Sequence, residues 1–311
     1  MPLSSPFISQ RRSRRAARVG VRPLALILCL AALGGAAALI ASATQSHAAR
    51  AAGAARAPRA SRGPLLASRL PALPLRPSPS PLSSAQLEQR AIDHVLGYTP
   101  FVRAGAAHRR LIALTFDDGP SPYTPAIVAE LVRLHVPATF FIVGQQLRYF
   151  AAGLRDEIRH GFAIGDHTEN HPPLALLSPA LQYFQIHAAA VQITRLGAPF
   201  PRLFRPPYAV YDAQTFAILR RLHMLMVMWS VDPRDWTRPG VAVIVRRVLA
   251  DARPGAIVEL HDGGGDRSQT LAALPAIVAG LRRRGYEFVT VPQLLVSDPP
   301  PRGQSLPPLS E

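Results

Sequence analysis

The sequence predicts an α/β fold in which a parallel sheet forms an incomplete or distorted (β/α)7–8 barrel. Apolar, β-rich segments alternate with helical segments from residue 111 to about residue 291, in about seven β/α units. Such alternation is typical of parallel sheets, in which a helix connects each strand to the next. In addition, polar clusters directly follow five of the strands, as expected at the carboxyl-terminal edge of a barrel.

Cap and turn residues set the boundaries of these elements. A capping box from Ser83 to Gln86 opens a helix that runs to about residue 96. Proline in the first turn starts two further helices, at Thr124-Pro125 and at Ser178-Pro179. We expect strands over residues 111–116, 138–143, 162–164, 203–205, 224–231, 257–260 and 287–291. We expect the connecting helices over residues 124–135, up to about 160, from 178 onward, and over 212–222, 241–252 and 271–284.

Basic charge is concentrated ahead of the expected globular part. The formal net charge is +16, and twelve arginines but no acidic residue precede residue 86. Six of these arginines precede an apolar segment, residues 24–43, that is long enough to span a bilayer. Because the charge flanks this segment and does not lie on a folded face, we expect no nucleic-acid partner. The positive-inside rule instead predicts a cytoplasmic N-terminus and an exported remainder.

The apolar segment is either an uncleaved membrane anchor or a signal peptide that is cut near Ala48. The protein is therefore expected at a bacterial cell surface with its globular domain outside, or as a secreted protein. The lone cysteine, Cys29, excludes an intramolecular disulfide. We expect a monomer with five regions: 1–48 basic and apolar, 49–82 a disordered Pro/Ala/Arg-rich linker, 83–109 a helical lead-in, 110–296 the catalytic domain, and 297–311 a flexible tail.

The polar clusters at the strand ends predict a shared active site. They are Asp117-Asp118, residues 167–172, residues 205–208, residues 232–236 and His261-Asp262. Each cluster has an ordinary structural explanation by itself, because Asp and Gly-Pro form turns and a histidine after an apolar strand is commonly buried and hydrogen-bonded. Five such clusters at successive strand ends of one sheet are hard to explain as scaffold alone.

Asp118, His167 and His171 are the candidate ligands of a divalent metal ion. The two histidines are four residues apart, which places them on one face of a helical turn. Two imidazoles and one carboxylate leave coordination positions open for water and a substrate oxygen, as in catalytic metal sites. Such an ion lowers the pKa of its bound water and polarises a carbonyl group. Asp117, beside the ligand Asp118, is the candidate general base.

Three further residues complete the predicted chemistry. Arg205 is expected to pair with Asp117, to orient it and to keep it ionised. His261 is the remaining imidazole at the strand ends and is the candidate general acid that protonates a leaving nitrogen. Asp235 is expected to orient His261 and to raise its pKa.

These ordered motifs resemble the polysaccharide deacetylase family, the NodB-homology domain of carbohydrate esterase family 4, over about residues 110–296. The resemblance implies hydrolysis of N-acetyl groups on β-1,4-linked amino sugars of a polysaccharide such as peptidoglycan or chitin, or of O-acetyl groups on xylan. It implies zinc as the usual ion, with cobalt or another divalent ion as a substitute. By similarity, the backbone N–H of Tyr208 would stabilise the oxyanion and Trp236 would form a wall of the substrate groove.

The chain departs from the family pattern at three positions. Ala209 stands where glycine is usual, and Asp166 stands where asparagine is frequent. Glu259 stands where the family usually places a leucine against the acetyl methyl group. Because a carboxylate is a poor wall for a methyl group, we expect that Glu259 turns aside or that Leu260 lines the pocket instead.

Other functions stay open at this point. An acetyl-xylan-type O-deacetylase or a small C–N amidohydrolase would use the same residues, because the length of the groove cannot be read from the sequence. A non-catalytic glycan-binding relative would keep the groove, although the complete set of candidate residues argues against it. A two-histidine, one-carboxylate iron oxygenase is disfavoured by the β/α alternation and by the second acid at Asp117.

Overall fold

The computed structural model of the chain describes residues 82–305. The apolar segment over residues 24–43 and nearly all of the expected linker lie outside these residues, so the anchor and the disordered linker stay predictions. Within the described part, no helix combines the length and the apolar character needed to cross a bilayer.

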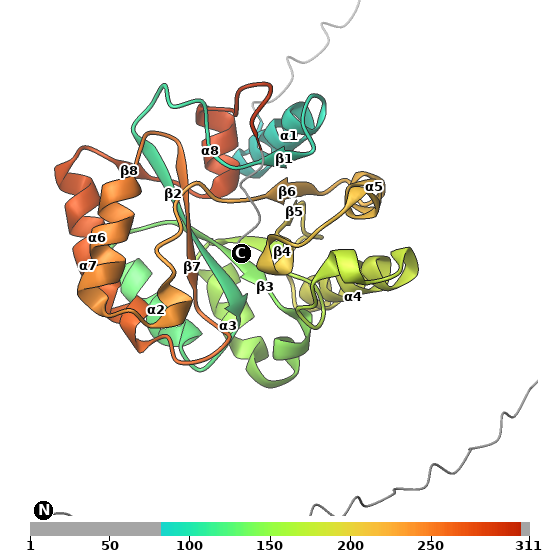
Figure 1. Cartoon of the computed structure of the whole chain (residues 1–311), viewed down its shortest axis with the longest axis horizontal. Helices are drawn as coiled ribbons and strands as arrows, with labels where there is room; N and C mark the ends of the chain where they lie inside the picture. Colours follow the sequence, from blue (N-terminus) through green and yellow to red (C-terminus); the bar gives the residue numbers. More distant parts are fainter. Residues whose placement is uncertain (1–81, 306–311) are drawn as a thin grey trace, which may run out of the picture. The chain divides into compact units, whose positions relative to one another are not determined.

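A sheet of eight parallel strands forms the centre of the fold (Figure 1). Its order is β1-β6-β5-β4-β3-β2-β7, and β8 pairs with the start of β2. In the described part of the chain, no continuous strand pairing joins the β1 side of the sheet to β7. Isolated bridges at Ala104–Ala256 and Val231–Val258 connect the two sides instead. The predicted incomplete barrel is therefore confirmed. The strands are β1 (Phe101–Val102), β2 (Leu111–Gly119), β3 (Ala138–Ile142), β4 (Ala163–Asp166), β5 (Leu203–Phe204), β6 (Leu225–Val227), β7 (Ala256–His261) and β8 (Glu287–Phe288).

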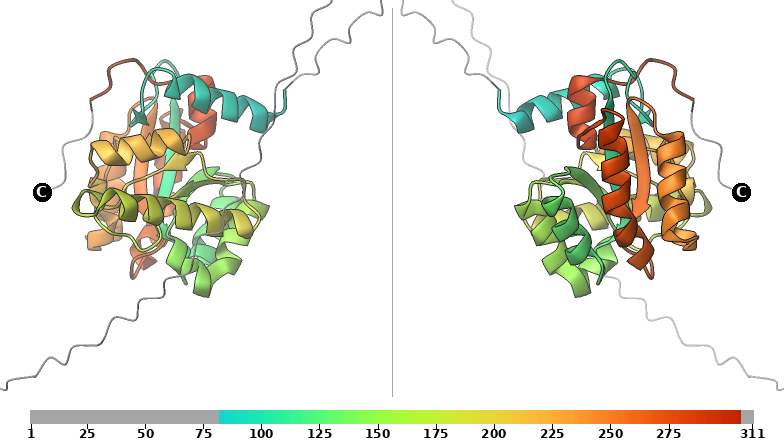
Figure 2. Two further views of the ribbon diagram at one scale, coloured as in Figure 1. Left: turned by 90° about the vertical axis from the view of Figure 1, so that its right-hand side faces the viewer. Right: turned by 90° about the vertical axis from the view of Figure 1, so that its left-hand side faces the viewer.

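Helices surround this sheet. In Figure 1, α6 and α7 lie on one side of the sheet and α4 and α5 on the opposite side, and the two turned views in Figure 2 show each pair in front of the strands. The helix α1 packs against α8. The bounds are α1 (Ser84–Leu96), α2 (Thr124–Arg133), α3 (Leu147–Arg159), α4 (Pro179–Arg195), α5 (Ala213–Arg221), α6 (Val241–Asp251), α7 (Ser268–Arg283) and α8 (Val291–Ser297).

The helix starts follow the cap residues of the sequence. Gln86 N donates to Ser83 Oγ at 3.3 Å, and Ser83 N donates to Gln86 Oε1 at 2.9 Å, which confirms the capping box of α1. Proline lies in the first turn of both α2 and α4, where no intrahelical N–H donor is needed. The Ser178 hydroxyl also accepts a hydrogen bond from the first turn of α4.

The strand β2 is buried on both faces, which explains its unbroken apolar sequence. Leu114 and Phe116 belong to the core between the sheet and the outer helices α2, α6 and α7. Ala113, one position away, belongs to the core inside the curve of the sheet. Because side chains alternate along a strand, Thr115 and Asp117 also face the inside, where the site lies.

Two strands end well before their predicted ends, for different reasons. The expected strand 224–231 stops at Val227, since its partner β5 has only two residues and the chain from Ser230 onward bonds to β7 instead. Ser230 N donates to Ile257 O at 3.0 Å, and Glu259 N donates to the Val231 carbonyl at 2.9 Å. The expected last strand ends at Phe288, because Thr290 caps the helix α8.

The Pro-rich segment after Val296 was expected to be flexible, yet its described part is attached to the lead-in as far as residue 305. Tyr98 Oη donates to Pro300 O at 2.7 Å, and Gln304 Nε2 donates to Ala104 O at 2.6 Å. Arg103 N in turn donates to Gln304 Oε1 at 3.0 Å. These three hydrogen bonds hold the described part of the segment against the lead-in despite its loop-like composition.

Candidate active site

The ends of strands β2, β4, β5 and β7 bring the candidate residues to one pocket of about 470 Å³. Parallel strands place all their carboxyl-terminal ends at the same edge of the barrel, so clusters far apart in the sequence converge there. The residues that line the pocket are Asp117, Asp118, His167, His171, Pro206, Tyr208, Trp229, Asp232, Arg234, Trp236, Glu259, His261, Gly264 and Arg267.

Asp118, His167 and His171 form a compact group whose ligand atoms lie within 4.8 Å of one another. Asp118 Oδ1 lies 3.5 Å from His167 Nε2 and 3.0 Å from His171 Nε2, and among residues 82–305 this oxygen has no regular hydrogen-bond partner. The His167 ring donates from Nδ1 to the Arg205 carbonyl at 2.7 Å, because a carbonyl oxygen only accepts, and this leaves the Nε2 lone pair free. His171 Nδ1 lies 3.0 Å from the Tyr208 hydroxyl.

These three residues fit a divalent cation. Burial lowers the pKa of His167 to about 4, which keeps its imidazole neutral, as a metal ligand must be. An orphaned carboxylate oxygen facing two free imidazole nitrogens is the donor set that catalytic zinc sites use. The described residues thus provide three ligands and an open side toward the pocket.

The backbone around this group is strained. Five non-glycine residues near it have positive φ angles: Asp118, Thr168, His171, Tyr208 and Ala209. Such conformations cost about 1–3 kcal/mol each and cluster at functional sites. Ala209 has φ 55°, which explains why glycine is the usual residue there.

Asp117 is paired with Arg205 inside the barrel. Arg205 Nη1 donates to Asp117 Oδ1 at 2.7 Å and to Thr115 Oγ1 at 2.8 Å, and both members of the pair are almost fully buried. The guanidinium group also lies over the Phe141 ring at 4.2 Å and bonds the Val227 carbonyl through Nε at 3.0 Å. The predicted contact between Arg205 and Asp117 is thus present, with the second Asp117 oxygen left for the pocket.

Asp235 holds His261 on the other side of the pocket. Asp235 Oδ1 lies 2.8 Å from His261 Nδ1, while Oδ2 accepts the His261 backbone N–H at 3.0 Å and the Thr270 hydroxyl at 2.6 Å. Burial lowers the pKa of His261, but the charge and hydrogen bond of Asp235, with the charges of Glu259 and Asp118, raise it to about 10. A protonated imidazole directed into the pocket can donate a proton.

The expectation for Leu260 is wrong. Leu260 is fully buried in the core between the sheet and the outer helices, because side chains alternate along β7 and Leu260 faces away from the barrel interior. Glu259 does not turn aside and lines the pocket itself. The other departure, Asp166, is fully buried and accepts the Thr168 backbone N–H at 2.7 Å, and burial raises its pKa well above the usual range.

The rim of the pocket contains two aromatic residues that the sequence analysis named, together with further residues to which it gave no role. Tyr208 and Trp236 are 57% and 51% exposed, as expected for residues that contact a large ligand. Arg234 lies in the predicted cluster 232–236 but had no assigned role, and Trp229 and Arg267 were missed. The alternation of the expected strand 224–231, which directs every second side chain into the barrel, was the available signal for Trp229. Arg267 comes from a glycine-rich loop whose path the sequence does not define.

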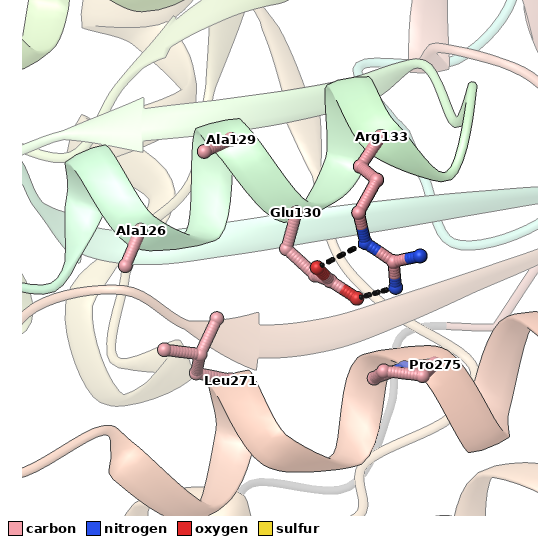
Figure 3. A pocket seen from close by; sticks show the side chains of 6 residues that line it. All are labelled: Ala126, Ala129, Glu130, Arg133, Leu271 and Pro275. Carbon is pink, nitrogen blue, oxygen red and sulfur yellow. Dashed lines mark hydrogen bonds and ion pairs between the residues drawn. The ribbon is translucent and has the colours of Figure 1, made fainter.

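A second, shallow depression lies between α2 and α7 (Figure 3). Its polar side chains, Glu130 and Arg133, lie one helical turn apart on α2 and bind each other through two hydrogen bonds. Ala126, Ala129, Leu271 and Pro275 form the remaining lining. With no free catalytic or ligand group, this depression offers no chemistry.

A family model described as polysaccharide deacetylase matches residues 104–227. The chain is also 41% identical over 199 residues to the chitooligosaccharide deacetylase of Bradyrhizobium sp. (strain ANU 289), an alignment that covers 60% of this chain and 90% of the relative. The chain belongs to the polysaccharide deacetylase family. It is therefore a hydrolase of the deacetylase type, and the family that its motifs resemble is confirmed.

Solved structures of carbohydrate esterase family 4 agree with this polysaccharide deacetylase fold. The Bc1960 peptidoglycan N-acetylglucosamine deacetylase has a TM-score of 0.63 and 30% identity, covering 67% of this chain and 97% of its own. BA3943, a family 4 pseudoenzyme from Bacillus anthracis, has a TM-score of 0.60 and 27% identity, covering 63% of this chain and 69% of its own. The likeness supports the half-barrel architecture, and the pseudoenzyme shows that this fold also occurs in a protein without the activity.

Proposed function

We propose that this chain is a metal-dependent deacetylase that removes N-acetyl groups from a peptidoglycan- or chitin-type amino-sugar polysaccharide. The observation that carries the proposal is the division of roles between two adjacent carboxylates. Asp118 faces two imidazole nitrogens, whereas Asp117 is fixed by Arg205 at the wall of the same pocket. One carboxylate can therefore hold an ion while the other accepts a proton.

The residues supply each part of an amide hydrolysis. A divalent ion held by Asp118, His167 and His171 would supply an acidified water and polarise the acetyl carbonyl, with zinc as the expected ion and cobalt as a substitute. Asp117 accepts the proton of the attacking water as general base. His261, oriented by Asp235, gives its proton to the leaving nitrogen, so that the C–N bond breaks and acetate and a free amine result.

The proposal also covers the residues that contact the sugars and the location of the domain at the cell surface. Trp236 and Tyr208 are large, exposed side chains on opposite clusters of the rim and are proposed to contact the sugars, with the Tyr208 backbone N–H aimed at the oxyanion. Curated relatives are named chitooligosaccharide deacetylase and peptidoglycan-N-acetylglucosamine deacetylase. With residues 24–43 as an anchor, the domain would act on glycan outside the membrane, as a monomer.

Acetate release from a panel of glycans tests the proposal. The full-length chain, supplied with zinc or cobalt, is expected to release acetate from chitooligosaccharide or wall glycan and to stop when EDTA is added. Asp117→Asn should bind the metal but lose nearly all activity, because the proton acceptor is gone and the ligands are intact.

Other outcomes identify the alternatives. Release from acetylated xylan alone indicates an O-deacetylase, and turnover of small amides alone indicates an amidohydrolase. Glycan binding and metal binding without acetate release on any substrate would refute the enzyme assignment, as for a pseudoenzyme.

A further inference from the structure

Glu259 places a carboxyl group on the floor of the pocket, and no step of the proposed reaction uses it. The residue is 7% exposed, and its carboxylate lies within 4.8 Å of side-chain ligand atoms of both Asp117 and His261. In the described part of the chain, this carboxyl group has no hydrogen bond or ion pair, although it lines the pocket. A ligand that displaces water from such a group must replace its hydrogen bonds, because a polar group left unsatisfied in a closed site is costly.

The backbone fixes the direction of this side chain. Glu259 pairs with Thr115 of β2, and its N–H donates to the Val231 carbonyl at 2.9 Å. The strand is thus held on both sides, and the alternation along β7 directs Glu259 into the barrel interior together with His261. This pairing fixes the side of the strand from which the Glu259 side chain extends.

The proposed chemistry places the acyl substituent beside Glu259. The base contacts the attacking water and the acid contacts the leaving nitrogen, so the acyl carbon lies between Asp117 and His261. The sugar stays at the open rim, where Tyr208 and Trp236 are exposed. The remaining substituent of the acyl carbon therefore points to the floor, where the Glu259 carboxyl group is.

Burial of the carboxyl group at this place favours its protonated, neutral form. Burial raises the pKa of Glu259 well above its usual range; the positive charges of His261 and Arg205 oppose this shift, and the negative charges of Asp117 and Asp232 support it. A protonated carboxyl group offers one O–H donor and a carbonyl acceptor. A methyl group would leave both unpaired, whereas a hydroxyl group on the same carbon would satisfy them.

We propose that Glu259 selects a small hydroxylated N-acyl group, such as hydroxyacetyl, over the plain acetyl group. The inference rests on the proposed function, because it concerns the acyl group that this hydrolysis removes. Water adds at the carbonyl carbon and the C–N bond breaks as before, so hydroxyacetate and a free amine result and the hydroxyl group is unchanged. Sites that hydrogen-bond a substrate hydroxyl discriminate more strongly than apolar pockets do.

Matched oligosaccharides test the selection. One chitooligosaccharide is prepared with N-acetyl and with N-hydroxyacetyl groups, and kcat/KM is measured from the free amine. The wild type should prefer the hydroxyacetyl form by about tenfold or more, the difference expected for one satisfied hydrogen bond in a buried site. Glu259→Leu should reverse the preference, whereas Glu259→Gln should keep it, because an amide also donates and accepts. Glu130→Gln, in the depression of Figure 3, should change neither rate.

Product binding gives a readout that does not depend on turnover. Hydroxyacetate should bind the wild-type protein about tenfold more tightly, relative to acetate, than it binds Glu259→Leu in a calorimetric titration, and equal ratios in the two proteins would count against the proposal, because chelation of a metal ion by hydroxyacetate is common to both. Faster hydrolysis of the acetyl form by the wild type, or an unchanged ratio in a folded Glu259→Leu, would overturn the selection while the proposed function stands. Failure of both substrates would overturn the proposed function and the selection with it.

Discussion

In the wild type, His261 is expected to stay protonated across neutral pH and to act as the proton donor. Asp235→Asn is expected to lower the pKa of His261, so that this proton, and with it the activity, is lost above neutral pH. In the structure, one carboxylate oxygen lies 2.8 Å from His261 Nδ1 and the other accepts the His261 backbone N–H and the Thr270 hydroxyl. The charge and hydrogen bond of Asp235 are the largest effects that oppose burial and hold the pKa of His261 at about 10. An asparagine keeps the size of the side chain and removes the charge.

The size of the effect follows from the titration. Without the charge of Asp235, burial opposes the remaining charges of Glu259 and Asp118, and the pKa of His261 should fall toward its ordinary value of about 6.5. At pH 8, about 3% of the imidazole would then carry a proton, so kcat should fall about thirtyfold relative to the wild type. At pH 6, most of the imidazole is still protonated and the loss should be less than about twofold.

The assay is the pH dependence of kcat from pH 5.5 to 9.5, with the His261 titration followed by NMR. Asp232→Asn is the matched control, since it removes a carboxylate from the same strand end that has no hydrogen bond to His261, and it should leave His261 protonated at pH 8. A ratio of wild-type to Asp235→Asn activity that stays constant across this range would refute the proton-donor reasoning.

Stability gives an independent measurement of the same interaction. Because the pKa of His261 is about 10 in the folded state and about 6.5 in the unfolded state, its proton stabilises the fold fully below pH 6.5. This contribution is lost as the pH rises toward 10. The free energy of unfolding of the wild type should therefore fall over this range more than that of Asp235→Asn, and equal slopes in urea titrations would contradict the assignment.

Three further predictions concern other parts of the fold. Arg205→Met should lower the free energy of unfolding by about 3–5 kcal/mol in urea titrations, because it leaves the buried Asp117 charge unpaired; a loss below about 1 kcal/mol would contradict this. His167→Ala and His171→Ala should each lose bound metal by elemental analysis of the purified protein, and full retention in both would refute the ligand set. Ser83→Ala should cost about 1 kcal/mol in thermal unfolding, whereas Ser83→Thr should cost little.

The sequence predicts most of the fold because its signals are local. The Ser83 capping box, the proline starts of α2 and α4 and the apolar run of β2 all act within a few residues, and all appear where expected. The strand β1 and the early end of β6 depend on partners far along the chain, which no local pattern reports. Likewise, the tail after Val296 is held by hydrogen bonds to residues about 200 positions away.

The same distinction holds for the site. Asp117 and Asp118 lie in the last residues of β2, and the two histidines lie just after β4, so the parallel sheet brings them together at one edge and the sequence reveals them. Glu259 and Leu260 are adjacent, and only the pleat of β7 decides which of them faces the pocket. The partner of His171 is the Tyr208 hydroxyl, which depends on a left-handed turn in the loop and has no periodic signal.

One guanidinium group connects distant walls of the half-barrel. Arg205 follows β5, bonds the end of β6 and reaches across the interior to two side chains of β2, while its own N–H bonds the Asp166 carbonyl of β4. The position of Asp117 and the spacing of the strands that Arg205 connects therefore depend on each other. A change that widens the barrel interior for a bulkier substituent would also move Asp117. We therefore expect sequence changes that alter specificity to occur in the outer loops and at pocket residues that do not contact Arg205.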